Sequence, residues 1–125
     1  MRISKKTSII LTEALREELY NIGSFELVNR EDLNRVIQEI RLKESGLVYE
    51  KDAVIIGGFL GARESITGRL NSLGNLYILS AKRTDIQTLK TKSLGSVTCP
   101  KGSEEGLLNI IPGLARKLAE ERALH

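Results

Sequence analysis

One stretch decides the fold class, Phe25-Glu-Leu-Val-Asn-Arg-Glu-Asp-Leu-Asn-Arg-Val-Ile-Gln-Glu-Ile40, because strand character gives way to helix character within it. Its first residues predict a short strand that ends at Asn29 or Arg30. Glu31 and Asp32 follow, at a position where the helix dipole favours negative charge. The next apolar residues recur at the helical spacing i, i+3, i+4 and i+7, and they are Leu33, Val36, Ile37 and Ile40. A strand that leads into an amphipathic helix predicts an α/β fold.

Length and composition indicate one globular domain over residues 1–125, in which the polar residues 1–6 are expected to be unstructured. The hydrophobic content of 41% and charged content of 28% are ordinary for a soluble protein, and the net charge of +3 does not require an anionic partner. Cys99 is the only cysteine, which excludes an intrachain disulfide and a cysteine-based zinc site. The longest apolar runs, 8–11 and 53–56, are too short to span a membrane, and no secretion signal is visible.

Four helices are predicted along the chain. The first ends at about Asn21, and the second begins in the stretch quoted above. The third covers residues 48–60. The fourth opens at Ser103 and contains Pro112, which is expected to kink it or to break it into two pieces.

Between the third and fourth helices the apolar pattern has a period of two, which predicts an antiparallel meander. Its strands are residues 64–70, 76–84 and 89–99, joined by a loop at 71–75 and a turn at 85–88. Gly95 is expected to break the third strand. In the second strand Tyr77, Leu79 and Ala81 share one face. The predicted architecture is therefore α/β, with a mixed sheet made of the short strand after the first helix and this meander, packed by about four helices.

The sequence predicts structural roles for two glycines and one arginine. Gly57 lies inside the third predicted helix, where glycine costs about 1 kcal/mol against alanine and often marks close approach to another backbone. Gly61 ends this helix. The run from Gly57 to Gly61 does not fit a phosphate-binding loop, because its glycines close a helix and precede a strand. Arg30 is either an exposed surface residue or, as we favour, a lock that forks onto carbonyls or a carboxylate at the strand–helix joint.

No catalytic, metal or cofactor site is predicted. His125 is the only histidine and the last residue, so a Ser-His-Asp or Cys-His arrangement lacks a positioned base. With one cysteine and one histidine, a transition-metal site would need carboxylates gathered from separate elements. The adjacent Glu31 and Asp32 point to different sides of a helix and fit a role at its N-terminus. The sequence therefore predicts a protein that is not an enzyme and binds no cofactor.

Basic residues gather on the predicted meander and form a candidate partner surface, made of Arg69, Lys82, Arg83, Lys90 and Lys92, with Lys101 nearby. A sheet can carry a nucleic-acid site, but such a site favours exposed aromatic side chains, and only Tyr77 lies in this region. A solvated sheet face with lysines on its edges explains the same charge. Nucleic-acid binding is therefore the alternative function, behind protein interaction.

A series of short segments, taken in order, resembles a known family. Residues 27–30 match a strand end that this family writes as Val-Val-Glu-Arg. The further matches are Ile37–Glu39, Glu44–Gly46, Gly57–Ala62, Ile66–Gly68, Tyr77–Lys82, Asp85 and Thr88. Together they resemble the curli assembly/transport component (CsgG-like) family, which is related to the N-terminal domain of the TolB translocation protein and to lipoprotein activators of penicillin-binding proteins. The resemblance covers roughly residues 11–118.

This resemblance implies an α/β sandwich like that of anticodon-binding domains. It implies a protein of the bacterial cell envelope, periplasmic or associated with the outer membrane, that acts through protein contacts and self-assembly without catalysis. It also implies structural roles for Gly61, Gly68 and Asp85. The alternative location is the cytoplasm, because no signal is visible in the sequence.

The sequence departs from the family at its start and at one turn. The family begins with an apolar strand, which residues 1–8 cannot supply because they offer only Ile3. Folded proteins usually pair or cover the edges of their sheets. The expected partner is therefore another protein or a second copy of the chain that supplies a strand, as a homo-oligomer or by strand exchange. The simpler alternative is a truncated chain. Leu89 stands where the family has a turn glycine, and the loop at 71–75 is too short to cross a bilayer.

Overall fold

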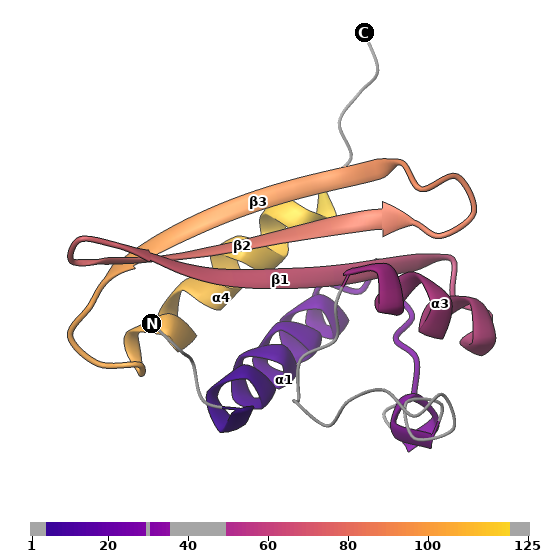
Figure 1. The fold of residues 1–125 in the computed structure, drawn as a ribbon, viewed down its shortest axis with the longest axis horizontal. Coiled ribbons are helices and arrows are strands. Elements are labelled where there is room, and N and C mark those ends of the chain that lie inside the picture. Colours follow the sequence, from indigo (N-terminus) through magenta and orange to yellow (C-terminus); the bar gives the residue numbers. More distant parts are fainter. Residues whose placement is uncertain (1–4, 30, 36–49, 121–125) are drawn as a thin grey trace, which may run out of the picture.

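The computed structural model describes residues 5–29, 31–35 and 50–120, and it has the predicted α/β architecture (Figure 1). The helices are α1 (Lys5–Ile22), α3 (Glu50–Leu60) and α4 (Gly106–Ala119), and residues 31–35 are also helical. The strands are β1 (Glu64–Leu73), β2 (Leu76–Asp85) and β3 (Thr91–Pro100).

The three strands form an antiparallel meander in the order β1-β2-β3, which confirms that prediction. The hairpin between β1 and β2 is tighter than the predicted loop at 71–75, because Leu73 pairs with Leu76. Only Gly74 and Asn75 lie between these two residues. Gly74 has a φ of 56°, and a type II′ turn requires a positive φ at this first central position. The prediction of a five-residue loop is therefore wrong.

Residues 25–28 form no strand, so the prediction of a mixed sheet is wrong for the described part of the chain. Nη2 of Arg16 in α1 donates a hydrogen bond to the carbonyl O of Val28 at 2.8 Å, which ties this segment to the helix instead of to a strand. Phe25 and Leu27 are half-buried against the core. The apolar pattern therefore reflects packing against the core without strand pairing.

Asn29 caps the short helical segment at residues 31–35. Its Oδ1 accepts hydrogen bonds from the backbone N–H groups of Glu31 at 2.8 Å and Asp32 at 3.4 Å, which is the geometry of an N-cap. The helix start predicted from the acidic pair is confirmed. The rest of the predicted apolar stripe, from Val36 onward, lies outside the described residues.

The core lies between one face of the sheet and the pair of helices α1 and α4, which pack against each other (Figure 1). Alternation along β2 directs Tyr77, Leu79 and Ala81 into this core, which confirms the prediction that they share one face of the strand. Cys99, near the end of β3, is buried in the same core. The most deeply buried large side chains belong to α4, and they are Leu107, Ile111, Leu114 and Leu118.

The first helix begins earlier than the sequence predicts. α1 includes Lys5 and Lys6, which the sequence predicts to be unstructured, and residues 1–4 lie outside the described part of the chain. Among the described residues, β1 and β3 are the two edges of the sheet. None of the described helices has the length and apolar character needed to cross a membrane.

Candidate protein-binding site

Four of the five predicted partner-surface residues lie on the meander and outside the core cluster. Alternation along the strands places Arg69 and Lys82 on the sheet face opposite α4. Lys92 occupies a bulge in β3, and Lys90 precedes that strand. Lys82 is half-buried and the other three are exposed. We call this set of four residues the basic face.

Arg83 does not belong to the basic face, and the prediction that placed it on a partner surface is wrong. It is only 3% exposed, because it continues the core-facing alternation of β2. Its Nη1 donates a hydrogen bond to the carbonyl O of Leu118 at 2.6 Å, and its Nε lies 3.4 Å from Oε2 of Glu64. The guanidinium also lies 5.4 Å from the centre of the Phe25 ring. The helix dipole favours a cation at the last carbonyls of a helix, so Arg83 holds the C-terminal end of α4 against the sheet.

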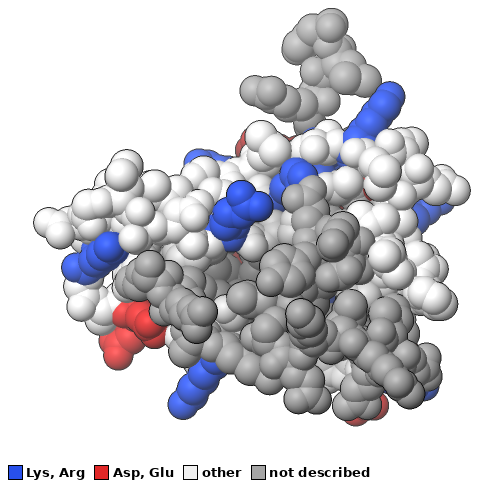
Figure 2. All heavy atoms as spheres, viewed as in Figure 1, with Lys and Arg blue, Asp and Glu red and all other residues white. Residues whose placement is uncertain are grey.

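The arrangement of charge and aromatic groups argues against a nucleic-acid site. Figure 2 shows the Lys and Arg side chains of the described residues at separate points of the face in view, with an acidic group at one side, and not gathered into one continuous patch. Tyr77 is only 8% exposed, so it offers no ring on which bases could stack.

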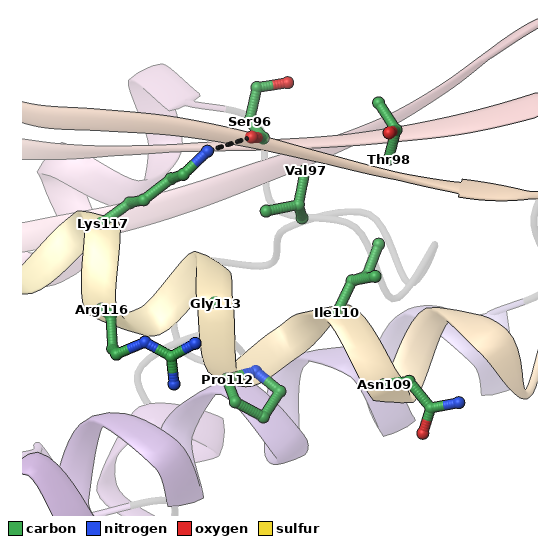
Figure 3. A pocket seen from close by; sticks show the side chains of 9 residues that line it. All are labelled: Ser96, Val97, Thr98, Asn109, Ile110, Pro112, Gly113, Arg116 and Lys117. Carbon is green, nitrogen blue, oxygen red and sulfur yellow. Dashed lines mark hydrogen bonds between the residues drawn. The ribbon is translucent and has the colours of Figure 1, made fainter.

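A groove of about 430 Å³ lies between the edge strand β3 and α4 (Figure 3). It is lined by Ser96, Val97 and Thr98 from β3 and by Asn109, Ile110, Pro112, Gly113, Arg116 and Lys117 from α4. The half-buried side chains of Val97 and Ile110 point toward each other and form an apolar floor. α4 continues through Pro112, so the predicted break of this helix does not occur.

Gly95 allows the close approach that shapes this groove. A Cβ at this position would lie 2.8 Å from Cβ of Lys117 and 3.3 Å from Cδ1 of Leu114. β3 runs through Gly95 without interruption, so the prediction of a strand break is wrong. A glycine inside a strand often marks close approach of another element, and this signal could have located the groove from the sequence.

Positive charge lies at the rim of the groove. Arg116 and Lys117 are exposed residues of the last turn of α4. Nζ of Lys117 donates a hydrogen bond to the carbonyl O of Ser96 at 2.8 Å, drawn as a dashed line in Figure 3. The nine lining residues include no carboxylate. The role of Arg116 and Lys117 at a groove was not predicted from the sequence, because only the apolar stripe of this helix forms a recognisable pattern.

Gly57 and Gly61 shape the end of α3. The N–H of Gly61 donates to the carbonyl O of Gly58 at 3.2 Å, and the N–H of Ala62 donates to the carbonyl O of Gly57 at 2.9 Å. This pair of bonds is a Schellman motif, and Gly61 supplies the positive φ, 70°, that it requires. A Cβ on Gly57 would clash with Cδ1 of Ile86, so α3 approaches the turn after β2 closely.

Asp85 organises the turn between β2 and β3. Its Oδ1 accepts a hydrogen bond from the backbone N–H of Thr88 at 2.9 Å. This bond is the main cause of the lowered pKa of the Asp85 carboxyl, and the charge of Lys92 adds to it. The N–H of Leu89 donates to the carbonyl O of Asp85 at 2.8 Å, and Leu89 has a φ of 62°, in the left-handed region that glycine adopts most readily.

The two remaining structural candidates receive no role from the geometry. A Cβ on Gly68 would make only an ordinary contact, 3.5 Å from the carbonyl O of Ser80, so the space at this position does not require glycine. Arg30 lies outside the described residues. In the part of the chain that the structure describes, no cluster of three or more His, Cys, Asp or Glu side chains could hold a metal ion. The basic face and the groove are therefore the candidate binding surfaces.

Comparison with known proteins finds one family and two solved structures. The family model described as peptidoglycan-synthase activator LpoB matches residues 8–89. The LpoB C-terminal domain from Salmonella enterica is similar with a TM-score of 0.62 and 25% identity, over 72% of this chain and 67% of that chain. The LpoB C-terminal domain from Escherichia coli gives a TM-score of 0.55 and 22% identity, over 65% of this chain and 61% of that chain, which shows the fold alone. The comparison with curated proteins gave no match. The matched model is that of the activators and not of the CsgG-like or TolB families.

Proposed function

Because the chain belongs to the peptidoglycan-synthase activator LpoB family, we propose that it binds a peptidoglycan synthase and raises its activity, and that it is not itself an enzyme. The family match over residues 8–89, which runs from α1 through the turn after β2, carries this proposal. The synthase makes the cell wall, so we place the protein in the bacterial cell envelope, on the periplasmic side and associated with the outer membrane. This role requires a contact surface and no catalytic group.

We further propose that the basic face is this contact surface. Arg69 and Lys82 lie on strands within the family match. Exposed positive charge on a sheet face favours an acidic surface on the partner and raises the association rate, with a strong dependence on salt.

The test measures binding and activation with the purified peptidoglycan synthases of the source bacterium. Binding is followed by biolayer interferometry, and activity by the rate at which a lipid-linked precursor enters glycan strands. We expect one synthase to bind and to react faster with the chain present. Absence of both effects with every synthase would refute the proposed function.

A charge reversal tests the surface separately. Arg69→Glu is expected to weaken binding about fivefold or more, mainly through the association rate. Lys6→Glu, at an exposed position on α1, is the matched control and should leave affinity unchanged. Equal affinities for both variants would exclude the basic face and leave the function itself standing.

Strand exchange between two copies also remains a prediction. The sheet of the described residues ends at β1 and β3, and either edge could accept a strand. Size-exclusion chromatography with light scattering measures the oligomeric state. A stable monomer at high concentration would exclude this arrangement.

A further inference from the structure

We propose that the groove between β3 and α4 binds an extended, carboxylate-bearing segment of a partner protein, which adds a strand to the edge of β3 that pairs with no other strand of the described residues. The family match ends at Leu89, before β3 begins, so the family assignment does not cover this groove. Binding of a segment in this groove is a different function from synthase activation, and an experiment can refute either one without refuting the other.

The edge of β3 offers a row of backbone hydrogen-bonding groups. The N–H of Lys101 donates to the carbonyl O of Asn75 at 2.7 Å, which extends the ladder between β2 and β3. Ladder bonds alternate along an antiparallel pair, so the backbone groups that point away from β2 belong to Leu94, Ser96 and Thr98. β3 is an edge of the described sheet, and an extended peptide can bind to such a row.

The groove has space for side chains of an added strand. Alternate side chains of that strand would point toward α4 and lie over Val97 and Ile110, the apolar floor seen in Figure 3. The lining of α4 leaves this space open at Gly113, where a Cβ would come no closer than 3.8 Å to Nη2 of Arg116. Apolar or β-branched residues therefore suit the positions of the segment that face the floor.

The charges select a carboxylate. Strand addition requires the carbonyl O of Ser96, which Nζ of Lys117 now occupies at 2.8 Å. The incoming backbone displaces this ammonium group, and a carboxylate on the segment can then accept its hydrogen bonds, with Arg116 beside it. Among the described residues no carboxylate lines the groove, so no acidic side chain of the lining competes with the segment for these cations.

The same charges disfavour a second copy of this strand as the occupant. β3 itself contains Lys92 and no carboxylate, so the edge of another copy does not complement Lys117. A lysine placed over an edge strand is also a common device against edge-to-edge pairing. A partner segment with an acidic residue is therefore the occupant that the groove fits.

Peptide selection tests the proposal directly. A display library of random heptapeptides is panned against the full chain, and the recovered peptides are synthesised. We expect Asp or Glu flanked by β-branched residues, and we expect the backbone amides of Ser96 and Thr98 to shift in NMR spectra when peptide is added. Affinity should fall about three- to tenfold in Lys117→Gln. It should stay unchanged in Lys92→Gln, which alters an exposed lysine of the same strand outside the groove.

Two further variants separate binding from folding. Arg116→Glu combined with Lys117→Glu should favour peptides whose acidic residue is replaced by lysine, a reversal that a folding defect cannot produce. Thr98→Pro removes an outward N–H and should abolish peptide binding while the urea midpoint shows a folded chain.

Three results would overturn the proposal. They are failure to recover any peptide, recovered peptides that lack acidic residues or bind away from Ser96 and Thr98, and a Lys117→Gln chain that dimerises through β3. The last result would assign the groove to a second copy. Loss of peptide binding in Thr98→Pro with synthase activation intact would show that the groove and the activating surface are separate.

Discussion

Replacing Arg83 with methionine tests whether a buried guanidinium holds the end of α4 to the sheet. The bond from Nη1 to the carbonyl O of Leu118, at 2.6 Å, has a charged donor, and bonds of this kind contribute about 1.5–3 kcal/mol. Methionine keeps most of the apolar stem, so little packing is lost. The Ser93 hydroxyl still donates to the same carbonyl at 2.7 Å. The Glu64 side chain is 30% exposed, so water can replace its lost partner at a cost below about 1 kcal/mol.

We therefore expect Arg83→Met to lower the free energy of unfolding by about 2–3 kcal/mol. Urea unfolding followed by far-UV circular dichroism should show a midpoint lower by about 1 M or more with an unchanged slope. Arg69→Met makes the same chemical change at an exposed position of the sheet and should stay within about 0.5 kcal/mol of the unaltered chain.

A double variant extends this test to the acceptor. Arg83→Met with Ser93→Ala should cost more than the sum of the single changes, because only then does the carbonyl of Leu118 lose both donors. Equal midpoints for Arg83→Met and Arg69→Met would refute the assignment of Arg83 as the lock of α4.

Three further predictions concern close packing, a helix end and pH. Gly95→Ala should destabilise the chain by about 1–3 kcal/mol because its Cβ meets α4, whereas Gly113→Ala should be neutral or stabilising by up to about 1 kcal/mol; equal urea midpoints would contradict this. Gly61→Ala should lower the free energy of unfolding by about 1 kcal/mol, because Gly61 has a φ of 70°. Gly58→Ala, inside α3 and open to solvent, should raise the stability. A higher melting temperature for Gly61→Ala than for Gly58→Ala would exclude the Schellman role of Gly61. Asp85→Ala should lower the free energy of unfolding at about pH 6, and the loss should become smaller below about pH 4. The pKa of the Asp85 carboxyl is lowered in the folded chain, so the ionised carboxylate stabilises the fold above its ordinary pKa, and protonation at lower pH removes this stabilisation. An equal loss at about pH 6 and at about pH 2.5 would contradict this prediction.

Periodicity predicted the elements that repeat a pattern over many residues. The helical stripe of α4 and the alternation through Tyr77, Leu79 and Ala81 both continue long enough to identify their faces, and both are buried. The same alternation also identifies Arg83 as core-facing. The sequence interpretation placed Arg83 on the surface because it gave more weight to charge than to position in the strand.

The features that escaped prediction depend on distances between elements. The segment at 25–28 has the apolar composition of a strand, but Arg16 of α1 takes the carbonyl that a neighbouring strand would need. The groove exists because Gly95 lets α4 approach β3, and no local pattern states how far apart two elements will lie. The sequence therefore predicted the candidate site only through the basic face, and the groove was not predicted because Gly95 was interpreted as a strand break.

The single buried cysteine makes the junction of β3 and α4 measurable without an added label. Cys99 is 7% exposed, and its Sγ lies 3.8 Å from the position that a Cβ on Gly106, the first residue of α4, would occupy. A thiol reagent can reach it only when the strand and the helix separate, so the labelling rate under native conditions gives the free energy of that local opening. If this free energy is smaller than that of global unfolding, α4 detaches from the sheet while the sheet itself stays folded. A segment bound in the groove would slow the same reaction, and Cys99 would then report occupancy in real time.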